Sequence, residues 1–200
     1  MTEFQKVLIA LVSIRNSTER AILSFYSFQG SNLASKPDRE NDPYLKFTLQ
    51  NYLLILLCSF LDEWNALSSH AKDNEAVREA QKIVKPALDR FKKWPHLHKI
   101  RSGMLAHSPN NHGELILPWE AFAKYRCPTT LEEILLLAFC ALMAVDYIKA
   151  RFQGELSDAE ASILEMDRTI NIQGIPNTKS LEKTFSEIQD EITKNKAAST

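Results

Sequence analysis

The chain of 200 residues is long enough for one domain, or one domain with an appendage, whose core needs no disulfide or metal to hold it together. Its hydrophobic fraction of 44% and charged fraction of 24% are those of an ordinary globular protein. The formal net charge of −1 excludes a global attraction to nucleic acid or anionic lipid, so any such affinity must come from local clusters. Glycine is scarce, with five residues, which favours helices over strands joined by tight turns.

Two long helices are predicted first. Thr2-Glu-Phe-Gln5 is a capping box, so the first helix begins at Thr2, and helical apolar spacing continues to about Gly30. A stretch of loop-forming residue types follows. Pro43 then suits the first turn of a second helix, which has Asp42 as its cap and runs to about Ser68.

A third helix is predicted to start after Asp73 or Asn74 and to run toward Trp94. Pro86 lies inside it and is expected to kink or break it, because proline removes a hydrogen bond and clashes with the preceding turn. Pro95 marks a boundary or opens a short fourth helix.

Residues 114–128 are the least helical part of the sequence. Thr130-Leu-Glu-Glu133 is a second capping box, which starts a long helix to about Gln153 with Gly154 as its stop. Ser157-Asp-Ala-Glu160 is expected to cap another helix.

The last predicted helix, over residues 179–194, has a sparse apolar face that packs on the domain or on a partner chain. The sequence therefore predicts an all-α fold. Residues 1–155 would form a bundle of six or seven helices, and residues 156–200 a C-terminal helical extension.

The cysteines Cys58, Cys127 and Cys140 form no C-x-x-C pair, which favours reduced thiols and a cytoplasmic protein. The first residues show no signal-peptide cleavage pattern. The longest apolar runs, residues 53–61 and 131–148, are too short or interrupted by acids, so we expect no membrane-spanning segment.

Positive charge gathers between residues 82 and 112, where Asp89 is the only acid. Four of the five histidines also fall in this window. Phosphate binding by local electrostatics requires such a cluster, although Lys82 and Lys85 could equally belong to a solvated helix face. The cations are Lys82, Lys85, Arg90, Lys92, Lys93, Lys99 and Arg101, with His96, His98, His107 and His112 beside them.

The segment Lys99-Ile-Arg101-Ser-Gly-Met-Leu-Ala-His107-Ser resembles the R-x(4–6)-H motif of HEPN domains, in particular those of the abortive-infection type. The resemblance covers roughly residues 1–155 in helix order, but only about ten residues around the motif are specific. It implies a HEPN-like bundle and a metal-independent endoribonuclease without a cofactor. It further implies an active site in a homodimer cleft, a toxin-type or phage-defence role, and a protein antitoxin as a candidate partner.

The chemistry suits these two side chains. RNA cleavage by its own 2′-hydroxyl needs a proton shuttle, and histidine titrates near neutral pH, so His107 is the candidate acid or base. Arg101 would bind the phosphate and stabilise the charge that develops in the transition state. The candidate RNA-binding residues are Lys92, Lys93, His96, His98 and Lys99.

Six steps along an α-helix turn through about 600°, which places Arg101 and His107 about 120° apart. Either the helix unwinds near His107, as Ser108-Pro109 would encourage, or two copies of the motif meet across a two-fold axis. Because HEPN domains use such a dimer cleft, we expect a homodimer.

Other interpretations stay open. Ser102 stands where many HEPN ribonucleases have Asn, Asp or His; it can still form hydrogen bonds, but the chain could be an inactive HEPN-like dimer that binds RNA, a nucleotide or a partner protein. In a purely structural interpretation, Arg101 pairs with Asp62 or Glu63 and His107 caps a helix end.

Two further patterns, the spacing of the histidines and the tryptophans, say less about function. His96 and His98 lie two apart, which points them to opposite sides of a helix, and no acid stands at ligand spacing, so no metal site is predicted. The tryptophans Trp64, Trp94 and Trp119 are expected to be packing residues.

Overall fold

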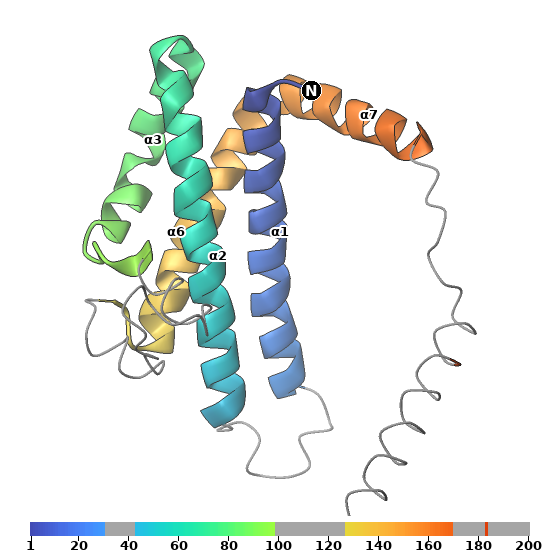
Figure 1. The fold of residues 1–200 in the computed structure, drawn as a ribbon. Helices are drawn as coiled ribbons and strands as arrows, with labels where there is room; N and C mark the ends of the chain where they lie inside the picture. Colours follow the sequence, from blue (N-terminus) through green and yellow to red (C-terminus); the bar gives the residue numbers. More distant parts are fainter. Residues whose placement is uncertain (31–42, 99–126, 170–182, 184–200) are drawn as a thin grey trace, which may run out of the picture. The chain divides into compact units, whose positions relative to one another are not determined.

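The computed structural model describes residues 1–30, 43–98, 127–169 and 183, and every regular element in these ranges is helical (Figure 1). This confirms the predicted all-α class for the described part of the chain. The elements are α1 (Glu3–Gly30), α2 (Pro43–Ser69), a short 3-10 helix (His70–Lys72), α3 (Glu75–Phe91), α6 (Leu131–Arg151) and α7 (Gln153–Thr169).

By its internal packing the chain divides into two units, Met1–Ala161 and Ser162–Thr200. The first unit contains α1, α2, α3, α6 and the start of α7. The predicted bundle of six or seven HEPN-like helices, and its boundary after residue 155, stay predictions.

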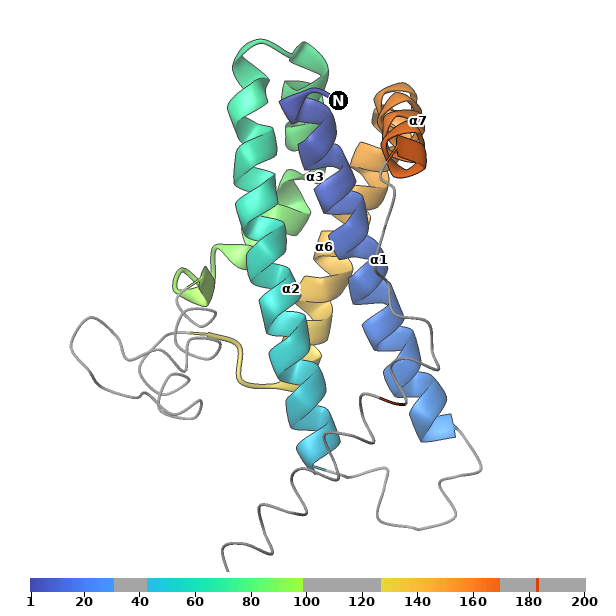
Figure 2. The ribbon, with the colours of Figure 1, turned by 45° about the vertical axis from the view of Figure 1, so that its right-hand side comes forward.

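The four long helices of the first unit run up and down beside one another (Figures 1 and 2). α1 packs on α2 and α6, and α3 packs mainly on α6. α6 is therefore the central element, as the burial of Leu137, Ala138, Ala144 and Val145 along it shows.

The helices begin close to the residues that the sequence predicted. Gln5 donates its backbone N–H to Thr2 Oγ1 (3.2 Å), and Thr2 donates its own to Gln5 Oε1 (2.8 Å), which is the predicted capping box. Asn74, rather than Asp73, caps α3 by accepting from the Val77 N–H at 3.2 Å. The predicted cap Asp42 lies outside the described residues.

Of the kink or break expected at Pro86, the break is wrong, because α3 continues through Pro86 to Phe91, and the kink stays a prediction. Pro86 is exposed, and buried residues on both sides of it (Ala80, Val84 and Phe91) hold the helix on the bundle. Their burial offsets the lost hydrogen bond.

Gly154 is not a helix stop. α6 already ends at Arg151, and α7 begins at Gln153 after the single residue Phe152, so the predicted cap over residues 157–160 lies inside α7. Phe152 is 2% exposed and Leu156 is 5% exposed, and the Leu156 N–H donates to the Phe152 carbonyl (3.0 Å). Burial of these two side chains therefore sets the junction.

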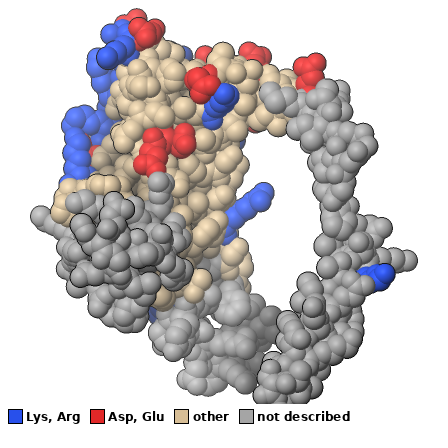
Figure 3. Space-filling model, viewed as in Figure 1, with Lys and Arg blue, Asp and Glu red and all other residues tan. Residues whose placement is uncertain are grey.

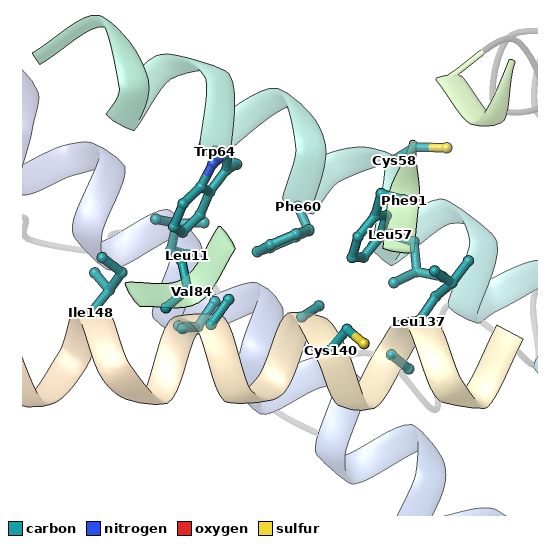
Figure 4. Packing of buried hydrophobic residues seen from close by; sticks show 14 of the residues in the cluster. Leu11, Leu57, Cys58, Phe60, Trp64, Val84, Phe91, Leu137, Cys140 and Ile148 are labelled. Atoms are coloured by element: carbon teal, nitrogen blue, oxygen red, sulfur yellow. The ribbon is translucent and has the colours of Figure 1, made fainter. Parts of the chain in front are cut away.

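The core of the bundle is apolar, and Phe60 lies fully buried within it (Figure 4). Its ring centre lies 5.8 Å from that of Trp64 and 5.4 Å from that of Phe91, which ties α2 to α3. Cys58 and Cys140 are buried and form no disulfide, in line with the predicted reduced thiols. Burial raises the pKa of the third buried thiol, Cys127, to about 11.

None of the described helices combines the length and the apolar content that crossing a membrane requires.

Replacement of Phe60 by alanine removes a fully buried ring between two aromatic neighbours. We expect the free energy of unfolding in urea to fall by about 3–5 kcal/mol. Phe139, which is 46% exposed on α6, is the matched control. Phe139→Ala should change the free energy of unfolding by no more than about 0.5 kcal/mol. Equal losses at the two positions would contradict this core.

Candidate functional site

The carboxylate of Glu133 joins three segments of the bundle. Glu133 lies in the first turn of α6, and its Oε2 accepts from Arg90 Nη2 of α3 at 2.7 Å. Its Oε1 accepts from the indole N–H of Trp94 at 3.1 Å. The hydrogen bond from Arg90 lowers the pKa of Glu133, so the carboxylate is charged at neutral pH.

This arrangement differs in part from the predicted second capping box. Thr130 Oγ1 accepts from the Glu133 N–H at 3.3 Å, as predicted. The Glu133 side chain, however, binds Arg90 and Trp94. A cation and an indole are better partners for a half-buried carboxylate than one more backbone N–H would be.

Residues 92–98 follow α3, with turns at 92–93 and 95–96 and helical backbone at Leu97 and His98; we call this segment the turn, and it is held at both ends. The N–H of Trp94 donates to the Phe91 carbonyl (2.9 Å), and the N–H of Leu97 donates to the Trp94 carbonyl (3.1 Å). Leu97 is 1% exposed, and its carbonyl accepts from the Cys58 thiol of α2 at 3.1 Å. The turn is thus fixed to α2 through Leu97 and to α6 through Trp94.

Exposed lysines follow the last turns of α3 into this turn, and we call Lys82, Lys85, Lys92 and Lys93 the basic edge. Figure 3 shows Lys and Arg side chains along the side of the molecule that α3 forms. Asp89 pairs with both Lys85 (2.7 Å) and Lys92 (2.5 Å), which lowers its pKa. Four lysines against one aspartate leave three positive charges in excess at the basic edge.

A pocket of about 380 Å³ opens between α2, the end of α3 and the turn, and we call it the Trp94 pocket. Most of its lining is apolar, with polar and charged side chains from the same three segments. The apolar residues are Leu61, Trp64, Leu88, Phe91, Trp94, Pro95 and Leu97, and the others are Asn65, Ser68, Lys85, Asp89, Lys92 and His98.

Some of the predicted RNA-binding residues lie on this surface. Lys92 and His98 line the Trp94 pocket, Lys93 is exposed beside it, and His96 is half-buried. The predicted catalytic residues and their neighbours lie outside the described residues, namely Lys99, Arg101, Ser102, His107 and Ser108.

Asp62 and Glu63, the acids named as possible partners of Arg101, face different ways. Asp62 follows Cys58 by one helical turn and so lies near the side of α2 that contacts Leu97. Glu63 lies five residues beyond Cys58, about 140° around the helix axis from it. Of the two, only Asp62 lies toward the turn that leads to residue 101.

A second hollow, of about 420 Å³, lies between α1, α6 and the start of α7. Asp146 and Glu160 line it against the single cation Lys149, so it does not favour an anion. Within the described ranges, no three His, Cys, Asp or Glu side chains are grouped as a metal site would need.

Sequence reasoning did not find the Glu133 contact or the Trp94 pocket. Trp64 is buried, as expected of a packing residue, but both it and Trp94 also border the pocket. The one available signal was the pair Trp94-Pro95, which follows the basic end of α3. It indicated only that a helix ends there.

No family model matches this chain, and neither a curated protein nor a solved structure is significantly similar to it. The resemblance to HEPN domains therefore rests on residues 99–108 and on helix order.

Replacement of Glu133 by glutamine should lower the free energy of unfolding at pH 7 by about 1–2 kcal/mol, because one hydrogen-bonded, partly exposed ion pair is removed. A carboxylate with a lowered pKa contributes stability above its unfolded pKa of about 4.3 and loses it as the pH falls. The difference between wild type and Glu133→Gln in urea unfolding should therefore shrink below about pH 4.

Glu132→Gln, at the exposed neighbouring position, is the control and should leave stability at pH 7 within about 0.5 kcal/mol of wild type. A Glu133→Gln deficit that stays constant from pH 7 to pH 3 would show that charge is not its cause.

Proposed function

We propose that this chain is a metal-independent endoribonuclease that holds RNA along the basic edge and cuts it with Arg101 and His107. The observation that carries the proposal is the basic edge itself, a local excess of positive charge on a chain whose net charge is −1. RNA is a polyanion, and a neutral protein needs such a local surface to bind it.

The basic edge leads into the motif segment. His98, at the end of the fixed turn, precedes Arg101 by three residues, and a chain of that length spans at most about 11 Å. A strand bound at the basic edge would therefore have a phosphate within reach of the Arg101 side chain. This nearness supports the assignment of binding and cleavage to one region.

In the proposed reaction the 2′-oxygen of the substrate forms a bond to the adjacent phosphorus, and the bond from phosphorus to the 5′-oxygen breaks. The 2′-hydroxyl loses its proton to a base, and the leaving 5′-oxygen gains one. His107 performs one of these two transfers. Arg101 stabilises the negative charge that develops on the phosphoryl oxygens.

The geometry of an R-x(5)-H motif favours a homodimer, because two side chains about 120° apart on one helix meet more readily across a two-fold axis. A protein antitoxin and a phage-defence role belong to the same proposal through the resemblance to HEPN domains.

Purified wild-type protein in EDTA should cut single-stranded RNA to products that end in a 2′,3′-cyclic phosphate. His107→Ala and Arg101→Ala should each lower the rate at least about 100-fold, since each removes a group that acts on the transition state. His70→Gln is the matched control, a histidine in the 3-10 helix whose ring packs on Phe4 of α1, and it should cut RNA at the wild-type rate. Binding of RNA without cleavage by any of these proteins would contradict the enzyme and support an inactive binding module.

Removal of the charges of Lys92 and Lys93 tests the basic edge separately. In a His107→Ala background, the Lys92→Ala/Lys93→Ala protein should bind RNA more weakly. The slope of the logarithm of the association constant against log salt should become less negative by about 0.7 for each phosphate that is no longer neutralised. Affinities come from fluorescence anisotropy between about 50 and 200 mM salt. Lys72→Ala/Lys149→Ala, which removes two exposed lysines elsewhere, should keep the parent slope. Identical slopes for the two double variants would mean that RNA does not lie on this edge.

A further inference from the structure

We propose that the Trp94 pocket is a subsite for one base of the bound strand, with the neighbouring phosphate held by Lys85 and Lys92. This inference rests on the proposed function and names the part of the substrate that the pocket would take. The ligand chemistry is a nucleobase joined to a phosphate, either within an RNA strand or as a free nucleotide.

The size and the walls of the pocket suit a base. Its volume of about 380 Å³ lies near the lower end of the range for ligand pockets, so it admits one small ring system rather than several nucleotides. Two indoles, Trp64 and Trp94, are among its lining residues. Aromatic side chains hold single-stranded nucleic acid by stacking on its bases.

The Trp94 wall is positioned before any ligand arrives. Its indole N–H donates to Glu133, and its backbone N–H donates to the Phe91 carbonyl, so both the ring and the chain that carries it are fixed. Binding then does not have to order this side chain, which lowers the entropic cost of association. Glu133 acts here as a positioning residue.

The polar residues that line the pocket complement a nucleotide. Lys85 and Lys92 share the single carboxylate Asp89, so one positive charge is left over for a phosphate. Asn65 and His98 offer donors and acceptors for a base edge, whereas the Ser68 hydroxyl already donates to the Trp64 carbonyl and accepts from Gln81. The hollow between α1, α6 and α7 has two carboxylates against one lysine and lacks this complement.

Asn65→Phe tests the subsite, because Asn65 is exposed on α2 and a larger side chain there narrows the pocket without entering the core. Ser13→Phe on α1 is the matched control, an exposed small polar residue outside the pocket. Binding is measured with the full chain carrying His107→Ala, in EDTA, for an eight-nucleotide oligoadenylate and for a ribose–phosphate chain of the same length without bases.

We expect the oligoadenylate to bind at least about tenfold more tightly than the base-free chain, as one or more stacked bases would give. Asn65→Phe should abolish this preference, and Ser13→Phe should retain it. Circular dichroism confirms that both variants are folded. Equal affinity of the parent protein for the two chains, or a full preference in folded Asn65→Phe, would overturn the subsite.

Competition identifies the source of the base. Displacement of the strand by adenosine monophosphate, but not by ribose 5-phosphate, would assign the pocket to a free nucleotide, whereas displacement by oligonucleotides alone would assign it to RNA. Cleavage by the chain with His107 intact is followed in parallel. Absence of cleavage together with a base preference that Asn65→Phe abolishes would refute the ribonuclease and leave the subsite standing.

Discussion

The contact of Glu133 with Arg90 and Trp94 is the constraint on which the candidate site depends. It joins the start of α6 to the end of α3 and to the turn that follows, through a carboxylate that uses both of its oxygens. Because Glu133 lies in the first turn of α6, the helix dipole also favours its charge. The contact keeps Trp94 in place as a wall of the pocket, and it holds the turn that leads toward residue 101.

The lysines at the end of α3 give a nearly neutral chain a basic surface, because they outnumber the acids beside them. Arg90 is paired with Glu133, whereas Asp89, the only acid between residues 82 and 98, pairs with Lys85 and Lys92. The ion pair of Arg15 with Asp146 lies between α1 and α6 and is partly exposed, so it contributes little to stability. Close packing of Phe60 and of the buried face of α6 holds α3, and with it the basic edge, rigidly on the bundle.

Local signals in the sequence predicted local structure well. Hydroxyl and amide caps at Thr2, Asn74 and Thr130 start helices because each bond is made within one turn of the chain. The break predicted at Pro86 and the helix stop predicted at Gly154 were wrong. Burial of neighbouring side chains decides whether a helix continues, and no local sequence pattern encodes that burial. The Glu133 contact joins residues 39 and 43 apart along the chain, so periodicity could not reveal it. The catalytic pair Arg101 and His107 stays a prediction from the motif alone.

The central claim is that RNA lies on the basic edge and enters the Trp94 pocket, and the location of bound RNA tests it most directly. Ultraviolet crosslinking of a 4-thiouridine RNA to the His107→Ala protein, followed by mass spectrometry of the crosslinked peptides, gives that location. The account predicts crosslinks concentrated in residues 61–68 of α2 and 85–98 of α3 and the turn. Crosslinks concentrated on the α1 and α6 residues around the Arg15–Asp146 pair, with none at the basic edge, would contradict it.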